Sequence, residues 1–179
     1  MDWLYTLSKP FRERRWRNAR NLSVANIPWY GWLKAKRIGV LFNASINRKD
    51  LQALRDVVQS LKLQHKSVTL CGWTGQMRPK NVLYNGRQLI FIDDFSWKGV
   101  AESGNALEFI QTEFDIIVTL NRGEDLPLDE LASKTAAGIR VVSEGEEDFY
   151  DFCMRPGTDD YRVYFSNLSE WLQKINPNS

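Results

Sequence analysis

The segment RIGVLFNAS at residues 37–45 decides the fold, together with SVTLCGW at residues 67–73. Both are short apolar runs, which indicates strands that are buried on both faces. Between them, apolar residues recur at helical spacing: Leu51, Leu54, Val57, Val58 and Leu61. That spacing predicts a helix with one apolar face against the sheet. A strand, a helix and a second strand in this order predict a right-handed parallel crossover.

The remaining chain repeats this alternation of strands and helices. The predicted strands are Ile38–Phe42, Val68–Cys71, Leu89–Ile92, Asp115–Leu120, Ile139–Val142 and Phe149–Met154. Further helices are expected around Asn105–Thr112, from Asp125 to a C-cap near Gly138, and along Tyr161–Ile175, which Asp159 or Asp160 caps. Asn85-Gly86 favours a hairpin or a tight turn before the third strand.

These patterns predict a single-domain α/β fold with a mostly parallel sheet of five to six strands, flanked by helices. The expected architecture is Rossmann-like or flavodoxin-like, with an N-terminal basic helical arm. We assign residues 1–36 to the basic aromatic arm and a connector, and residues 37–176 to the α/β domain.

Charge is unevenly distributed along the 179 residues. The net charge of +2 combines about +7 over residues 1–37 with −5 over the remainder. No secretory signal and no membrane-spanning apolar run is recognised. The two cysteines, Cys71 and Cys153, are expected to be buried free thiols. We therefore expect a cytoplasmic protein.

The sequence lacks the common signatures of cofactor chemistry. Neither a P-loop nor a dinucleotide fingerprint is present, because Gly72-Trp-Thr-Gly75 has neither the spacing nor the following helix. One histidine, His65, and two separated cysteines cannot build a zinc site. We expect no cofactor, no metal site and no catalytic residues, and we favour a non-enzymatic role while leaving enzymatic activity open.

Five segments occur in order before the closing helix. They are DFSWKG at 94–99, EFDIIVTL at 113–120, PL at 127–128, AAGIRV at 136–141 and FYDFCM at 149–154. Together with that helix they resemble an uncharacterised family of short cytoplasmic proteins from the Bacteroidota, a domain of unknown function. The resemblance covers roughly residues 35–175. It implies the fold and a bacterial cytoplasmic setting, and it supplies no catalytic residues.

The N-terminal arm carries the strongest functional signal. Pro10 suits the first turn of a helix that runs to about Arg20, with its aromatic side chains on the body and its arginines in water. Arginines interleaved with aromatic residues can neutralise phosphates and stack on unpaired bases. The residues expected to bind a partner are Arg12, Arg14, Arg15, Trp16, Arg17 and Arg20. The alternatives are a helix lying on anionic lipid and a solvated basic helix packed on the acidic body.

A second candidate site lies where the predicted sheet changes direction. Open α/β sheets bind ligands beyond the carboxyl ends of their strands, at the point where strand order reverses. If the order is 3-2-1-4-5, the residues around that crevice are Asn43, Ser45, Asn47, Arg48, Asn121 and Arg122. Backbone N–H groups, a hydroxyl and two arginines suit an anion. The alternative, which we favour, is that Ser45 and Asn47 cap a helix while the arginines face water.

Asp93 and Asp94 follow the third strand. Paired carboxylates could bind Mg²⁺ or act as acid and base. We favour the interpretation that they form the turn, since successive side chains of a strand diverge and Asp is an ordinary turn residue.

The sequence therefore favours a non-enzymatic binding or adaptor protein. Its basic arm would engage an anionic partner, with RNA or a ribonucleoprotein ahead of a membrane surface. The alternatives are a small enzyme or ligand-binding domain that uses the strand-end crevice, and a subunit that binds a protein partner.

Overall fold

The structure, a computed structural model, describes residues 9–15, 26–79, 88–120, 126–144, 149–157 and 160–175. Six parallel strands form one sheet in the order β3-β2-β1-β4-β5-β6. The strands are β1 (Arg37–Asn43), β2 (Ser67–Trp73), β3 (Gln88–Ile90), β4 (Phe114–Leu120), β5 (Ala137–Val142) and β6 (Phe152–Cys153). The parallel sheet confirms the predicted α/β class.

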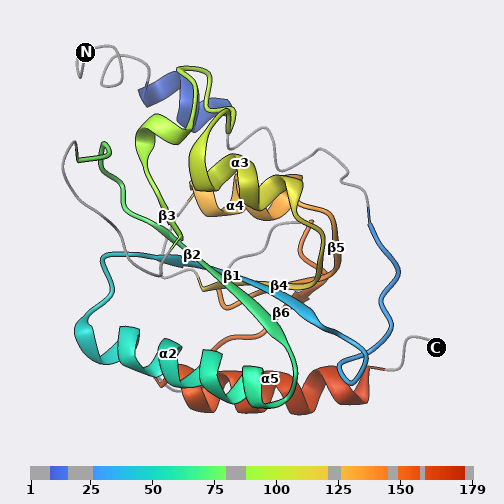
Figure 1. Cartoon of the computed structure of the whole chain (residues 1–179). Helices are drawn as coiled ribbons and strands as arrows, with labels where there is room; N and C mark the ends of the chain where they lie inside the picture. The colour runs from blue at the N-terminus through green and yellow to red at the C-terminus, as the bar shows by residue number, and fades with distance from the viewer. Residues whose placement is uncertain are drawn as a thin grey trace.

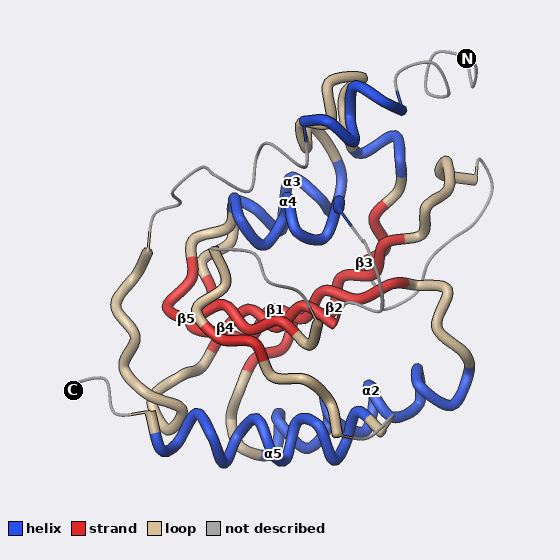
Figure 2. Tube along the Cα trace, turned by 180° about the vertical axis from the view of Figure 1, so that it is seen from behind, coloured by secondary structure: helices blue, strands red, loops and turns tan. Residues whose placement is uncertain are grey.

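Helices cover both faces of this sheet. They are α2 (Arg48–Leu63), α3 (Gly104–Gln111), α4 (Leu126–Lys134) and α5 (Tyr161–Lys174), with a 3₁₀ turn, η1 (Ile92–Asp94). Residues 9–15 are also helical, and we call them the N-terminal helix. Figures 1 and 2 show α2 and α5 on one face and α3 and α4 on the other, with the N-terminal helix on the α3/α4 side.

The central strand β1 shows why the sequence folds this way. Its apolar residues alternate between two core clusters: Val40 packs with the buried side chains of α2 and α5, while Leu41 packs with those of α3 and α4. Both residues are almost fully buried. A strand covered on both faces reads as a continuous apolar run, which is the pattern that predicted it.

Several predicted boundaries are wrong. Gly138 was expected to cap α4, but β5 already begins at Ala137, because Ala137 pairs with Phe114 of β4. The third strand ends at Ile90, where the chain turns into η1. The sixth strand is shortened to Phe152–Cys153. The turn expected at Asn85-Gly86 lies outside the described residues.

Side-chain burial also departs from expectation at two positions. Cys71 is fully buried as predicted, whereas Cys153 is exposed on the edge strand β6. The helical spacing of large apolar residues over 161–175 predicts an inner stripe for α5 that includes Trp171, but Trp171 is 52% exposed. The other large residues of that stripe are buried: Tyr161, Tyr164, Phe165, Leu168 and Leu172. Asp160 caps the helix by accepting from the backbone N of Arg162 at 2.9 Å, and Asp159 lies outside the described residues.

The connector, residues 26–36, runs from the N-terminal region to β1 and is held to the body. The Nζ of Lys66 donates to the carbonyl oxygens of Trp32 and Ala35, both at 2.7 Å. The carboxylate of Asp115 accepts from the backbone N of Lys36 at 2.7 Å, and the backbone N of Ile27 donates to Ala137 at 3.3 Å. The connector is therefore fixed at both ends.

Candidate functional site

The strand order places a topological switch point between β1 and β4. These two strands pair in parallel, with Leu41 opposite Thr119. The crossover after β1 uses α2 on one face, and the crossover into β4 uses α3 on the other (Figure 2). The carboxyl ends of β1 and β4 are therefore where a sheet of this type accommodates a ligand.

The first candidate residues at this edge use their side chains in local hydrogen bonds. The Oδ1 of Asn43 accepts from the backbone N of Ser45 at 2.9 Å and from its Oγ at 2.6 Å. The Oδ1 of Asn47 accepts from the backbone N of Asp50 at 2.9 Å, so Asn47 is the N-cap of α2. Turn formation and helix capping thus account for all three side chains.

The remaining crevice residues are only partly described. Arg48 is exposed in the first turn of α2, while Asn121 and Arg122 lie outside the described residues. One further group at this edge was not anticipated. The Oγ1 of Thr119 is fully buried and has no hydrogen-bond partner. Buried hydroxyls without a partner are uncommon, because each costs desolvation energy.

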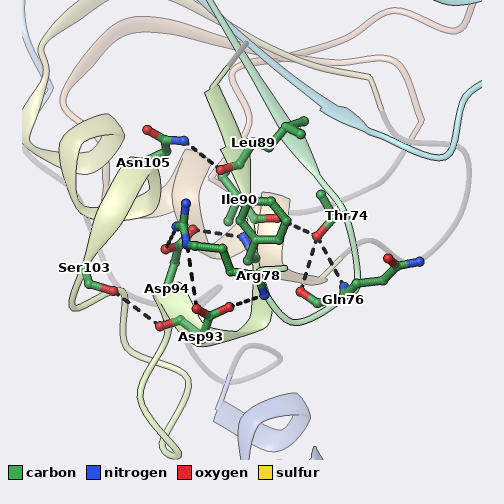
Figure 3. Close-up of polar contacts among 10 residues, drawn as sticks. Thr74, Gln76, Arg78, Leu89, Ile90, Asp93, Asp94, Ser103 and Asn105 are labelled. Carbon is green, nitrogen blue, oxygen red and sulfur yellow. Dashed lines mark hydrogen bonds and ion pairs between the residues drawn. The ribbon is translucent and has the colours of Figure 1, made fainter. Parts of the chain in front are cut away.

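A polar cluster follows β2 and β3 at the same edge of the sheet (Figure 3). The guanidinium of Arg78 donates to the carboxylate of Asp94, and its Nε lies 3.7 Å from Oδ2 of Asp93. The Oδ1 of Asp93 accepts from the backbone N of Arg78, and the Oδ2 of Asp94 accepts from that of Phe91, at 2.8 and 2.9 Å. Each carboxylate therefore ties two chain segments together.

Burial and hydrogen bonding act on Asp94 in opposite directions. Desolvation raises its pKa, while the hydrogen bond from Phe91 and the contact with Arg78 lower it; the net direction is upward. Gly104 closes the cluster from the start of α3, with φ of +54°. A Cβ there would lie 2.8 Å from Nη2 of Arg78, so a side chain would meet both strain and a steric clash.

The N-terminal helix departs from the predicted exposure at Phe11 and Arg12, while Arg14 is exposed as expected. Arginines were expected in water and aromatics on the body, yet Arg12 is only 5% exposed and Phe11 is 63% exposed. Nη2 of Arg15 lies 3.9 Å from Oε1 of Glu130 in α4, while Arg14 is exposed. The helix thus turns two arginines toward the body. Trp16, Arg17 and Arg20 lie outside the described residues.

Glu130 is the acidic partner in this contact. Its side chain is 4% exposed within α4, and burial raises its pKa against the lowering effect of Lys134 and Arg15. Neither Oε2 of Glu130 nor Nε of Arg15 has a hydrogen-bond partner, although both atoms are buried. A buried polar atom left unpaired costs about 1–3 kcal/mol, so this contact is weaker than its burial suggests.

The loop between η1 and α3, residues 95–103, lies beside the N-terminal helix in both overall views (Figures 1 and 2). It carries Trp97, which is 59% exposed, and the exposed Lys98. The Nζ of Lys98 lies 5.1 Å from the centroid of the Trp97 ring. Two neighbouring segments therefore each present an aromatic ring together with a cation.

Sequence reasoning missed three of these features. Trp97 entered the sequence analysis only within the DFSWKG segment of the resemblance, and no local pattern reports the exposure of one ring. Arg78 and Glu130 find their partners across loops and layers, so spacing along the chain gives no signal.

Comparison with known proteins supplies the family. The model of a Family of unknown function (DUF6913) matches residues 17–175. The chain belongs to this family. The match begins earlier than the resemblance at 35–175 and covers the whole sheet of this DUF6913 protein, together with α2 to α5. The N-terminal helix precedes the matched span, whereas Glu130 and Trp97 lie within it.

No curated protein and no solved structure matches this DUF6913 chain. Among its described residues, no cluster of three or more histidine, cysteine, aspartate or glutamate side chains could ligate a metal ion. None of its described helices is long and apolar enough to cross a bilayer.

Proposed function

We propose that this DUF6913 protein is a non-enzymatic binding protein. It engages single-stranded RNA through the N-terminal helix and the adjoining loop of residues 95–103. One observation carries the proposal. Phe11 and Trp97 stand largely in solvent on two segments that lie side by side, and each has a cation nearby in sequence, Arg14 and Lys98 respectively.

The chemistry of single-stranded RNA fits these side chains. Its unpaired bases stack on exposed aromatic rings, and its phosphates attract arginine and lysine. Base stacking on one aromatic residue contributes about 1–3 kcal/mol and tolerates any base. The charge of +7 over residues 1–37 supports attraction to a polyanion, although Arg12 and Arg15 point toward the body.

Fluorescence polarisation with a labelled oligouridylate of about twelve nucleotides tests this proposal. Trp97→Ala and Phe11→Ala should each weaken binding about tenfold, since each removes one stacking surface. Arg14→Glu should also weaken binding and make it less sensitive to salt. Trp171→Ala is the matched control: its ring is 52% exposed but lies on α5, on the other face of the sheet (Figure 1). It should leave binding unchanged.

Two further outcomes would replace the proposal. Failure to bind the oligonucleotide, with salt-dependent binding to vesicles containing anionic phospholipid, would favour the membrane-surface alternative. Capture of a protein from native cells that survives nuclease treatment, again without RNA binding, would favour a subunit of a protein complex. Equal effects of Trp97→Ala and Trp171→Ala would also count against the assigned surface.

A second candidate function is a ligand-binding or enzymatic role at the strand-end crevice. The observation that favours it is the unpartnered Oγ1 of Thr119, buried at the switch point between β1 and β4. A small anion with acceptor oxygens would pair with this hydroxyl. Thermal unfolding with added inorganic phosphate is the test: Thr119→Val should abolish any rise in the midpoint seen with the unaltered protein.

We also propose a bacterial cytoplasmic setting, in the Bacteroidota. The resemblance described above supports it. So do the two free thiols, Cys71 and Cys153, which suit a reducing compartment.

A further inference from the structure

We propose that the contact between Arg15 and Glu130 is an autoinhibitory latch, in which a carboxylate of α4 occupies an arginine that would otherwise bind the phosphates of RNA. This inference rests on the proposed RNA-binding function and concerns how that surface is regulated. Docking of the N-terminal helix engages Arg15 with Glu130 and leaves 39% of the Arg15 side chain exposed. RNA gains full access to this guanidinium when the helix separates from α4.

The position of the two arginines supports the latch. Arg12 is 5% exposed, and Arg15 lies with Nη2 3.9 Å from Oε1 of Glu130. Arg14, between them, is exposed. In this short helix Arg12 is therefore buried, Arg14 stands in solvent, and Arg15 contacts Glu130 of α4 with 39% of its side chain exposed.

The quality of the contact separates a latch from a permanent structural link. Arg140 donates from Nε, Nη1 and Nη2 to three acceptors at 2.7 to 3.0 Å, and it is almost fully buried. Arg15 makes one long ion pair, and its Nε is buried without a partner, as is Oε2 of Glu130. The three hydrogen bonds of Arg140 satisfy its guanidinium. The contact of Arg15 with Glu130 leaves a donor and an acceptor unpaired, and another ligand could satisfy them.

Phosphate competes well with Glu130 for this arginine. A guanidinium binds carboxylate and phosphate through the same fork of N–H donors, so the two are alternative partners. RNA presents many phosphates and also stacks on nearby rings, which Glu130 cannot do. Partner binding and helix docking are therefore linked through one arginine.

The test is that substitutions at Glu130 and at Arg15 change RNA binding in opposite directions. Glu130→Gln should tighten binding of the oligouridylate about fivefold, because it removes the competitor. Arg15→Gln should weaken binding and reduce the salt slope by about 0.7, because it removes a phosphate contact. The matched controls are Glu170→Gln on α5 and Arg55→Gln on α2, both exposed on the opposite layer, and neither should change binding.

Hydrogen exchange of the protein alone, measured over residues 9–15, is independent of RNA. Glu130→Gln should accelerate exchange in this helix, and Glu170→Gln should not. If Glu130→Gln misfolds, Glu130→Asp tests the same point, since the shorter side chain lengthens the contact.

The two proposals fail separately. If the unaltered protein binds RNA but Glu130→Gln neither tightens binding nor speeds exchange, the latch is wrong and the RNA function stands. If both variants weaken binding, the pair is only structural and the latch is again wrong. If RNA does not bind at all, the proposed function is wrong and the latch to RNA falls with it.

Discussion

The Nη1 of Arg140 in β5 donates to Oδ1 of Asn26 at 2.7 Å, joining residues 114 positions apart. The same guanidinium donates from Nε to the carbonyl oxygen of Ala132 and from Nη2 to that of Thr135, at 3.0 and 2.7 Å. It thereby binds the end of α4, the segment that leads into β5, and the start of the connector. The hydrogen bonds to Ala132 and Thr135 are buried, so these two carbonyl oxygens depend on Arg140, whereas Asn26 is exposed.

Replacing Arg140 should destabilise the fold strongly. Arg140→Met should lower the free energy of unfolding by about 3 kcal/mol, because buried acceptors lose their donors. Arg140→Lys should lose nearly as much, since one ammonium cannot reach three acceptors arranged around a planar fork. Urea denaturation measures both, and exposed Arg55→Lys is the control, expected within about 0.5 kcal/mol of the unaltered protein. Unaltered stability of Arg140→Lys would contradict the assigned role.

The start of α3 should tolerate only glycine at position 104. Gly104→Ala should lower the free energy of unfolding by about 1–3 kcal/mol, because an alanine with φ of +54° is strained and its Cβ would crowd Arg78. Gly157→Ala is the control, since a Cβ at Gly157 meets nothing within 4 Å. Chemical denaturation of the two variants side by side tests the difference, and equal losses would argue against the Arg78 cluster.

The buried ammonium of Lys66 should stabilise the connector. Lys66→Met keeps most of the side-chain volume but leaves the carbonyl oxygens of Trp32 and Ala35 without this donor. We expect a loss of about 2 kcal/mol in the free energy of unfolding. Lys34→Met, at an exposed position of the same connector, should have little effect. Thermal unfolding distinguishes the two variants. A lower midpoint for Lys34→Met but not for Lys66→Met would contradict the role given to Lys66.

The raised pKa of Glu130 should make stability depend on pH. Burial raises this pKa above its ordinary value of 4.5, so over the interval above 4.5 the folded protein holds the proton more tightly than the unfolded chain. The free energy of unfolding therefore falls as pH rises through that interval. Asp94, whose pKa is also raised, acts in the same direction.

Urea denaturation between about pH 4.5 and 7.5 isolates the part that Glu130 contributes. Glu130→Gln should show a smaller fall than the unaltered protein, because the contribution of Glu130 is removed and that of Asp94 remains. Glu170→Gln should match the unaltered protein. Asp160, whose pKa is lowered to about 2, has its effect below this range. Identical pH profiles for Glu130→Gln and the unaltered protein would show that Glu130 does not titrate differently on folding.

The sheet could be predicted because its signal is local and repeated. β1, β4 and β5 are apolar runs, and polar turns or amphipathic helices bound each of them. One predicted boundary failed where a partner strand decides it. Gly138 looked like a helix cap, but pairing of Ala137 with Phe114 draws it into β5.

The candidate site could be predicted only in part. The N-cap role of Asn47 could be predicted because this residue directly precedes the helix, and the structure confirms it. The orientation of the N-terminal helix does not follow, because a helix with Phe11, Arg12 and Arg15 can bury either kind of side chain. The contact of Arg15 with Glu130 shows the orientation that the helix adopts, and Glu130 lies on an element that no local pattern links to residue 15.

The connector spans a fixed distance between two anchored ends. It is held near its start by Asn26 and Ile27 against β5, and near its end by Lys66 and Asp115. One inserted residue would add about 3.5 Å of chain between these points and would break the match at one end. Insertions and deletions within residues 28–35 should therefore be selected against more strongly than substitutions at exposed positions such as Leu33. At such positions the path of the backbone is constrained, while the side chain stands in solvent.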